Sequence, residues 1–365
     1  MNKGNNKLNI TIVGAGNSGT AHAFVLSRMG HKVTLLKTSR SMHDENYDAI
    51  ARQGGVYGID ETICTPEREF VPIHAITRNP EEAFADADVV LVLTQSLQHK
   101  RVAELILPHI QHVKAVVVVP GNLGSIYFRR GLPDNVLVAE GESTIIDARI
   151  ADPGTVQILF RNVRNALSFI PASDTSRGFA YLSAAIPNYT HTRSNVVETA
   201  LHNPNLIVHT VGTIMSASRI EHSKGEFWLY REGFTPSIWN VINALDAEKM
   251  AVMQAYGATP ATYLDSCKFR NEADLEKDSM EVFRHYAEHG SPKGPGTIHN
   301  RYLTEDVPNG LCVLGKLGHI AGVPTPMADA LTSLASVMLG TDLAKDSRDF
   351  DEVGWRTKED ILKEI

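Results

Sequence analysis

One helix in the second half of the chain is expected to present an amide and an imidazole one turn apart. Asn203 and Pro204 are typical of an N-cap and a first helical residue, so Asn205 and His209 would share one helix face. An amide and an imidazole placed in this way can act on one substrate group. His202, in the kink expected before the helix, is a rival imidazole, and a purely structural role for His209 is the alternative.

A pair of carboxylates provides the second candidate for chemistry. Glu305 and Asp306 lie in the run RYLTEDVPNGL, which begins at Arg301 and follows the glycine-rich loop SPKGPG. An acid that is held rigidly can orient a histidine and stabilise charge on its ring. The two acids could instead only cap the next helix, and both interpretations stay open at this point.

A glycine turn near the N-terminus predicts a dinucleotide site. The apolar run Leu8–Val13 precedes it, a helical pattern over Thr20–Met29 follows it, and His31–Leu36 reads as a second strand. In such a unit the first glycine allows the sharp turn, the second lets a pyrophosphate approach the backbone, and the third lets helix and strand pack closely. The helix N-terminus then holds the phosphates. The predicted cofactor-binding residues of this glycine turn are Gly14, Ala15, Gly16, Asn17, Ser18 and Gly19.

The residues after the second strand favour NADP over NAD. An NAD site usually places an acidic residue here for the ribose 2′-hydroxyl, whereas an NADP site offers cations and hydroxyls to a 2′-phosphate. Lys37 stands near the acidic position, Thr38, Ser39 and Arg40 follow, and no carboxylate occurs until Asp44. We therefore predict NADP as the cofactor, with NAD as the alternative, and these first four residues as its ligands. Solvated loop charges are the competing interpretation of the two cations.

Short apolar runs in the first half indicate a mostly parallel sheet that is buried on both faces. These runs are Val89–Leu93, Ala115–Val119 and Val136–Ala139. Polar residues follow each run, at the strand ends where open α/β sheets bind ligands. We predict that Thr94 contacts the cofactor, and the substrate-binding candidates are Glu140, Glu142 and Ser143.

The second half of the chain has a different pattern. Beyond about Asn188 the β-branched runs give way to long helical patterns, which predict helices over Asn195–Ser218, Pro236–Tyr256, Asn271–His289, Leu311–Ala321 and Met327–Leu339. The predicted fold class is therefore α/β. It combines an N-terminal Rossmann-type, doubly wound, mostly parallel sheet over residues 1–188 with an all-α C-terminal domain over residues 189–365.

Composition excludes several classes of protein. The net charge of -7 gives no basic surface for nucleic acid or an anionic membrane, and no apolar run is long enough to span a bilayer. Met1–Lys7 lacks the apolar core of a signal peptide, and the three cysteines are widely separated. We expect a cytoplasmic protein with reduced thiols and no metal site. The apolar helix faces of the second half make a homodimer plausible.

Three stretches of the second half resemble the octopine/nopaline dehydrogenase (opine dehydrogenase) family. They are NPNLIVHTVGTIMSASRIE, FWLYREGFTPSIWNVINALDAEKMAV and RYLTEDVPNGL, and the similarity extends to the glycine turn and to the segment AFADADVVLV. The resemblance implies that His209 and Asp306 form the catalytic pair, with Asn205 as their partner. It also implies that Arg301 contacts the cofactor pyrophosphate as the domains close. The family usually has proline after the histidine, where this chain has Thr210.

The resemblance implies an NAD(P)-dependent oxidoreductase that acts on CH–NH groups. Such an enzyme condenses an amino acid or amine with an α-keto acid, reduces the resulting imine, and catalyses the reverse oxidation. A dehydrogenase for a small hydroxy acid or a polyol phosphate is one alternative, but such families use a helical lysine, and Asn195–Ser218 contains none. A non-catalytic sensor of the nicotinamide cofactor is another, and it would tolerate the loss of His209.

Overall fold

The computed structural model describes residues 7–365. The chain divides into two compact units, the first up to Thr192 and the second Arg193–Ile365, where the sequence pattern predicts a division near Asn188. The expectation about a signal peptide rests on Met1–Lys7, which lies outside the described residues except for Lys7.

The first unit contains a sheet of eight strands. They are β1 (Asn9–Val13), β2 (Lys32–Leu36), β5 (Ala75–Thr77), β6 (Val89–Val92), β7 (Ala115–Val118), β8 (Leu137–Gly141), β11 (Ala166–Phe169) and β12 (His191–Thr192). Their order across the sheet is β12-β11-β8-β7-β6-β1-β2-β5. All neighbours pair in parallel except β11, which runs antiparallel to β8. The prediction of a mostly parallel, doubly wound sheet is confirmed.

The apolar runs form the centre of this sheet. Every residue of β6 and β7 is buried, because helices cover both faces of a parallel sheet. The central strand β1 pairs with β2 on one side and with β6 on the other. The carboxyl ends of these three neighbouring strands therefore bring Gly14, Lys37 and Thr94 to one edge of the sheet.

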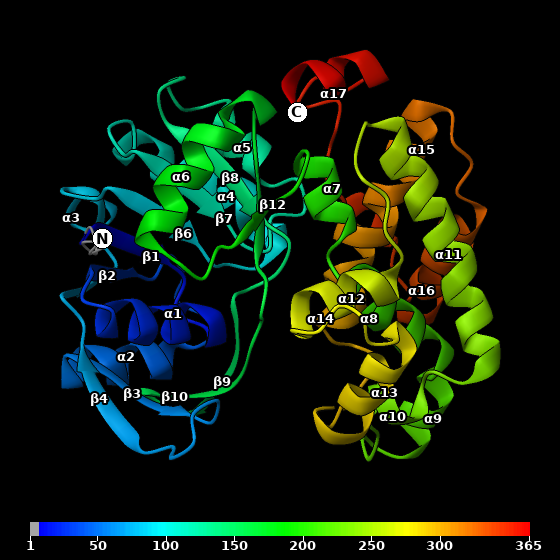
Figure 1. Ribbon diagram of the computed structural model, residues 1–365, viewed down its shortest axis with the longest axis horizontal. Coiled ribbons are helices and arrows are strands. Elements are labelled where there is room, and N and C mark those ends of the chain that lie inside the picture. The colour runs from blue at the N-terminus through cyan, green and yellow to red at the C-terminus, as the bar shows by residue number, and fades with distance from the viewer. Residues whose placement is uncertain (1–6) are drawn as a thin grey trace. The chain divides into compact units, whose positions relative to one another are not determined.

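A second sheet of four strands was not predicted from the sequence. Its order is β4 (Arg68–Pro72), β3 (Gly55–Asp60), β10 (Thr155–Arg161) and β9 (Ile146–Asp152), and β3 and β10 pair in parallel across a long sequence separation. Helix α1 (Asn17–Arg28) lies between the two sheets (Figure 1). Phe24 is fully buried on this helix, and a Cβ on Gly58 of β3 would overlap its ring.

Further helices complete the first unit. They are α2 (Asp44–Gln53), α3 (Pro80–Phe84), α4 (His99–Ile106), α5 (Ser125–Arg129) and α6 (Thr175–Ala185), with the short 3₁₀ helices η1 (Ser96–Gln98), η2 (Leu107–His109) and η3 (Ala172–Asp174).

The second unit is helical, as predicted. It consists of α7 (Val196–Leu201), α8 (Asn205–Met215), α9 (Ala217–His222), α10 (Leu229–Glu232), α11 (Pro236–Ala255), α12 (Tyr263–Asn271), α13 (Ser279–His289), α14 (Arg301–Thr304), the π-helical turn η4 (Val307–Leu311), α15 (Cys312–Ala321), α16 (Pro326–Leu339), the 3₁₀ helix η5 (Leu343–Asp346) and α17 (Lys358–Glu364). Within residues 7–365, no helix combines the length and the apolar character needed to cross a membrane.

Two predicted helices have different bounds in the structure. The pattern over Asn195–Ser218 is divided among α7, α8 and α9, because Pro204 cannot continue the backbone hydrogen bonds of α7. The prediction of one helix over Asn271–His289 is wrong at its start. Asp278 accepts a hydrogen bond from the Glu281 amide, so α13 begins only at Ser279.

Candidate active site

His209 is positioned by the start of α8. The Asn203 side-chain oxygen accepts a hydrogen bond from the Asn205 amide at 3.0 Å, which satisfies one of the free N–H groups at the helix N-terminus. Asn205 is half-buried, and His209 follows it one turn later with its ring buried. Thr210, where the resembled family has proline, donates its hydroxyl to the Leu206 carbonyl one turn back. The helix therefore continues through His209 without a break.

Asp306 is positioned by the turn η4, which packs closely against α8. A Cβ on Gly310 of η4 would lie 3.3 Å from the Leu206 Cα, so a larger residue would push the two elements apart. Asp306 comes directly before η4 and is buried. The sequence separates it widely from His209, but this close packing brings both residues to one place in the second unit.

The imidazole of His209 and the carboxylate of Asp306 form a hydrogen bond. His209 Nδ1 lies 2.7 Å from Asp306 Oδ2, and each side chain is 7% exposed. Because a carboxylate can only accept, the ring carries a proton on Nδ1, and in the neutral ring the lone pair is on Nε2. Such a ring can accept a proton at Nε2 while the carboxylate offsets the charge that forms.

Tyr302 of α14 stacks on the imidazole, a contact that the sequence analysis missed. The two ring centroids are 3.5 Å apart and the ring planes differ by 9°. The Asn300 side chain holds the start of α14 by accepting from the Tyr302 amide at 2.7 Å. The sequence signal that could have predicted this contact is the aromatic residue one helical turn before Asp306.

The other predicted residues of this unit lie nearby in the sequence but differ in burial. Arg301 is exposed at the start of α14, whereas Glu305 is buried next to Asp306. His202 is buried elsewhere and shares a hydrogen bond of 3.0 Å with the Ser266 hydroxyl. Its pKa is lowered to about 2, first by burial and then by the charges of Arg193 and Lys249. This ring therefore stays neutral near neutral pH, so His202 is less suited to proton transfer than His209.

The glycine turn fits the phosphates of a dinucleotide. Gly14 has a φ of 119°, and a Cβ on Gly19 would lie 1.8 Å from the Gly14 carbonyl oxygen, so both positions require glycine. Gly16 is the N-cap of α1, where neither a capping side chain nor a first-turn acid competes for an anion. A Cβ on Gly14 would lie 3.4 Å from Thr94 Cγ2, so this side chain borders the turn. The Thr94 hydroxyl oxygen is buried with no hydrogen-bond partner in the described part of the chain.

Lys37 is held inside the first unit. It is 4% exposed, and Nζ donates to Ser39 Oγ at 3.1 Å and to the Met42 carbonyl at 2.9 Å. Nζ also pairs with Asp44 at 3.0 Å, and Arg78, which follows β5, pairs with the same carboxylate at 2.9 Å. Arg78 was not predicted from the sequence, because it reaches Asp44 only through the parallel pairing of β2 with β5.

The remaining residues predicted after Lys37 differ in exposure. Thr38 and Ser39 are half-buried, and Arg40 is exposed. Of the two cations among the four predicted residues, Arg40 is exposed to solvent and Lys37 is buried.

The candidate substrate residues lie after β8. Glu140 is fully buried, and its two oxygens accept from the Ser125 amide at 2.8 Å and the Leu123 amide at 3.2 Å. This carboxylate therefore contributes to the start of α5. Glu142 is buried, and Ser143 is half-buried with its hydroxyl donating to the Thr144 carbonyl at 3.5 Å.

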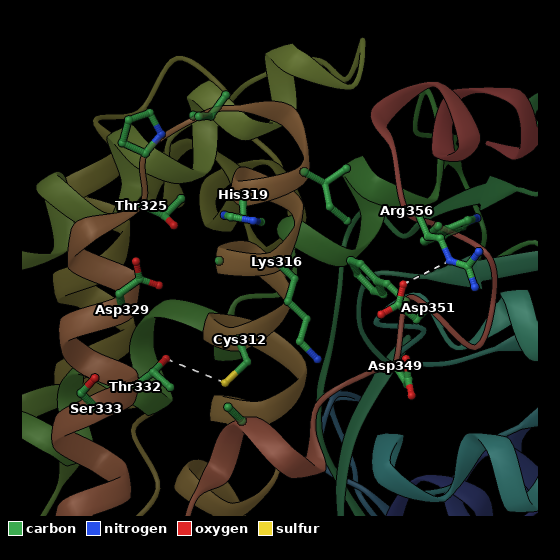
Figure 2. A pocket seen from close by; sticks show the side chains of 17 residues that line it. Cys312, Lys316, His319, Thr325, Asp329, Thr332, Ser333, Asp349, Asp351 and Arg356 are labelled. Carbon is green, nitrogen blue, oxygen red and sulfur yellow. Dashed lines mark hydrogen bonds and ion pairs between the residues drawn. The ribbon is translucent and has the colours of Figure 1, made fainter.

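A separate pocket of about 800 Å³ lies within the second unit (Figure 2). Lys316 and His319 of α15 line it together with Asp329 of α16, and the ion pair between Asp351 and Arg356 lies at its other side. None of the residues predicted from the sequence to do chemistry is among those that line this pocket. The hydrogen-bonded pair on α8 and before η4 therefore remains the candidate site.

Two family models match different parts of the chain. Residues 192–339 match the model of a family described as NAD/NADP octopine/nopaline dehydrogenase, alpha-helical domain. Residues 10–125 match the model of ketopantoate reductase PanE/ApbA. An opine dehydrogenase of Arthrobacter sp. (strain 1C) is 28% identical over 358 residues, which cover 94% of each chain. Residues 192–339 of the second unit thus carry the helical domain of the octopine/nopaline dehydrogenase family.

Solved structures show the same opine dehydrogenase fold. Octopine dehydrogenase with NADH and L-arginine superposes with a TM-score of 0.77 at 21% identity and covers 98% of each chain. A yersinopine dehydrogenase with NADP⁺ bound superposes with a TM-score of 0.71 at 16% identity, over 96% of this chain and 93% of that one. The opine dehydrogenase family thus includes members solved with either nicotinamide cofactor.

Proposed function

We propose that this chain is an NAD(P)H-dependent opine dehydrogenase. It joins an amino acid or amine to an α-keto acid through an imine, reduces the imine to a secondary amine, and catalyses the reverse oxidation. The contact between His209 Nδ1 and Asp306 Oδ2 carries this proposal, because an imidazole that is hydrogen-bonded to a carboxylate can transfer protons. Both residues belong to the helical unit that matches the opine dehydrogenase family model. The relatives that support it are opine dehydrogenases, and one was solved with NADH and L-arginine.

His209 is the acid–base group of the proposed reaction. When bound, the reduced nicotinamide supplies the hydride that reaches the imine carbon. In the oxidative direction His209 Nε2 takes the proton of the secondary amine, and in the reductive direction the protonated ring returns it. Asp306 holds the proton of the neutral ring on Nδ1 and offsets the positive charge of the doubly protonated ring. Tyr302 holds the plane of the imidazole.

Other residues have binding roles in the proposal. Asn205 assists at the substrate, with Glu142 and Ser143 as further candidates, and Arg301 binds the cofactor pyrophosphate. Glu140 acts indirectly, because its oxygens already accept backbone hydrogen bonds at the start of α5.

We propose NADP as the preferred cofactor. Asp44 is the nearest carboxylate after β2, and hydrogen bonds from Arg78 and Lys37 lower its pKa and occupy it. It is therefore a poor acceptor for a ribose 2′-hydroxyl. Arg40 is exposed in the same segment and is suited to a 2′-phosphate. Titration with NADPH and NADH, followed by protein fluorescence, tests this proposal, and tighter binding of NADH would overturn it.

A substrate screen tests the proposed activity. Amino acids are combined with pyruvate, oxaloacetate or 2-oxoglutarate, and the oxidation of NADPH or NADH is followed by absorbance. We expect turnover that requires both the amine and the keto acid. Turnover with a keto acid alone would instead identify a hydroxy-acid dehydrogenase. Cofactor binding with no turnover in any combination would favour a sensor.

We also propose a homodimer that forms through the helical unit. Leu334 and Val337 of α16 are 44% and 79% exposed, although both are large and apolar. Light scattering at several concentrations, with Val337→Asp as the perturbing variant, tests this proposal. A wild-type chain that is monomeric throughout would refute it.

A further inference from the structure

His43 lies beside the middle glycine of the glycine turn. It comes between β2 and α2 and has a left-handed backbone with a φ of 62°. A Cβ on Gly16 would lie 3.3 Å from His43 Cδ2 and 3.5 Å from His43 Nε2. The edge of the imidazole thus borders the space that glycine keeps open for a phosphate in such turns.

The residues on both sides of His43 are fixed by two buried or partly buried cations. Lys37 Nζ donates to the Met42 carbonyl and pairs with Asp44, so it holds the residue before His43 and the residue after it. Arg78 also pairs with Asp44 and donates to the Ser39 carbonyl. The segment on both sides of His43 is therefore held by bonds within the first unit.

Charged residues of both signs lie near His43. Lys37 and Arg78 share the Asp44 carboxylate, Arg40 and Glu45 are exposed in the same segment, and α1 has no acid in its first turn. His43 itself is exposed. Partial desolvation of its ring and then the Lys37 charge lower the pKa of His43, so the ring is neutral near pH 7. A phosphate anion beside the ring would reverse this balance, because an opposite charge favours the protonated form.

We propose that His43 is a ligand of the cofactor pyrophosphate at the glycine turn and takes up a proton when the dinucleotide binds. This inference rests on the proposed use of a nicotinamide dinucleotide. The protonated ring donates from Nε2 to a phosphate oxygen, while the α1 N-terminus supplies backbone N–H groups. Both NADH and NADPH carry the pyrophosphate, so His43 supports the binding of each and does not discriminate between them.

Calorimetry with His43→Asn tests the proposal. Asparagine tolerates the left-handed backbone and serves as an N-cap, so the variant keeps the local fold but cannot be protonated. His74→Asn is the matched control, because His74 is an exposed histidine of the same unit that lies outside the glycine turn. The dissociation constants of NADH and NADPH are measured at pH 6 and pH 8, and proton uptake is obtained from two buffers of different ionisation enthalpy.

The proposal predicts a specific set of results. At pH 6 the His43→Asn variant binds both cofactors about tenfold more weakly than wild type, and its proton uptake is lost. At pH 8 the two proteins differ less, and the His74→Asn control matches wild type throughout. A loss confined to NADPH would place the ring at the 2′-phosphate and overturn the proposal, as would unchanged binding or unchanged proton uptake. Wild-type protein that binds neither cofactor would overturn both proposals, whereas tight, proton-linked binding without turnover would overturn only the proposed activity.

Discussion

The ring of Tyr302 lies parallel to the imidazole of His209, with 3.5 Å between the ring centroids. Asp306 holds the same imidazole at its Nδ1 edge. The ring is therefore fixed in two directions, one by the stack that sets its plane and one by the hydrogen bond that sets its rotation.

This stack predicts a positioning role for Tyr302. Tyr302→Leu removes the flat surface, and we expect kcat to fall up to about tenfold, because an aromatic pair contributes roughly 0.5–1.5 kcal/mol. Tyr302→Phe keeps the stack and should retain most of the activity. The measurement is the pH profile of kcat, together with the dissociation constant of the cofactor. A Leu variant with an unchanged pH profile and unchanged kcat would refute the positioning role.

Asp306→Asn tests the hydrogen-bonded pair. The amide can donate to Nδ1, which would place the ring proton on Nε2 and prevent that atom from accepting a proton. We expect kcat to fall by about 10²- to 10⁴-fold while the cofactor still binds. The neighbouring Glu305→Gln is the matched variant and should lose less than Asp306→Asn. If the Glu305 variant lost more, the carboxylate that orients His209 would be assigned wrongly.

Arg40→Ala tests cofactor preference. Arg40 is exposed after β2, whereas Lys37 is buried and paired with Asp44. The dissociation constant of NADPH should therefore rise about tenfold, and that of NADH should stay within twofold. The exposed Arg101, on α4, provides the control variant Arg101→Ala. An equal loss for both cofactors would show that Arg40 does not recognise the 2′-phosphate.

His22 makes the stability of the first unit depend on pH. Its Nδ1 donates to the Ser18 carbonyl at 2.7 Å, and burial, opposed by this bond, lowers its pKa from 6.5 to about 4. Below pH 6.5 the unfolded chain binds a proton that the folded chain refuses, so the free energy of unfolding falls as the pH falls towards 4. The loss approaches about 3 kcal/mol at the acidic end and vanishes above pH 6.5.

Urea unfolding at pH 7 and pH 4.5 measures this effect. His22→Gln keeps a donor for the Ser18 carbonyl but cannot titrate, so its stability should change less between the two pH values than that of wild type. His74→Gln, at an exposed histidine, should behave as wild type does. Equal pH dependence in wild type and His22→Gln would contradict the assignment.

Local patterns predicted much of the fold. The glycine turn, the buried runs of β6 and β7 and the helical second half each depend on neighbours in sequence, through turn geometry, burial and helical periodicity. His209 and Asp306 are far apart in the sequence, and only the family resemblance suggested that they meet. The contact itself depends on the packing of η4 against α8, with Gly310 facing Leu206.

The features of the structure that were not predicted from the sequence depend mainly on contacts between distant segments. The sheet of β3, β4, β9 and β10 joins strands whose exposed residues interrupt the apolar pattern. Arg78 reaches Asp44 only because β5 lies beside β2. Helix α12 was missed because its sequence, YLDSCKFRN, has no strong apolar stripe, and its start depends on the Thr262 cap.

The pairing of β10 with β3 has a consequence for synthesis on the ribosome. The hairpin of β3 and β4 is synthesised long before β10. One edge of β3 therefore lacks its native partner while the intervening strands are translated. An uncovered strand edge invites pairing with other chains. The nascent first half is thus most prone to aggregation until Arg161, the last residue of β10, has left the exit tunnel. A fragment that ends before Thr155 lacks β10, so this edge of β3 would stay unpaired and prone to aggregation.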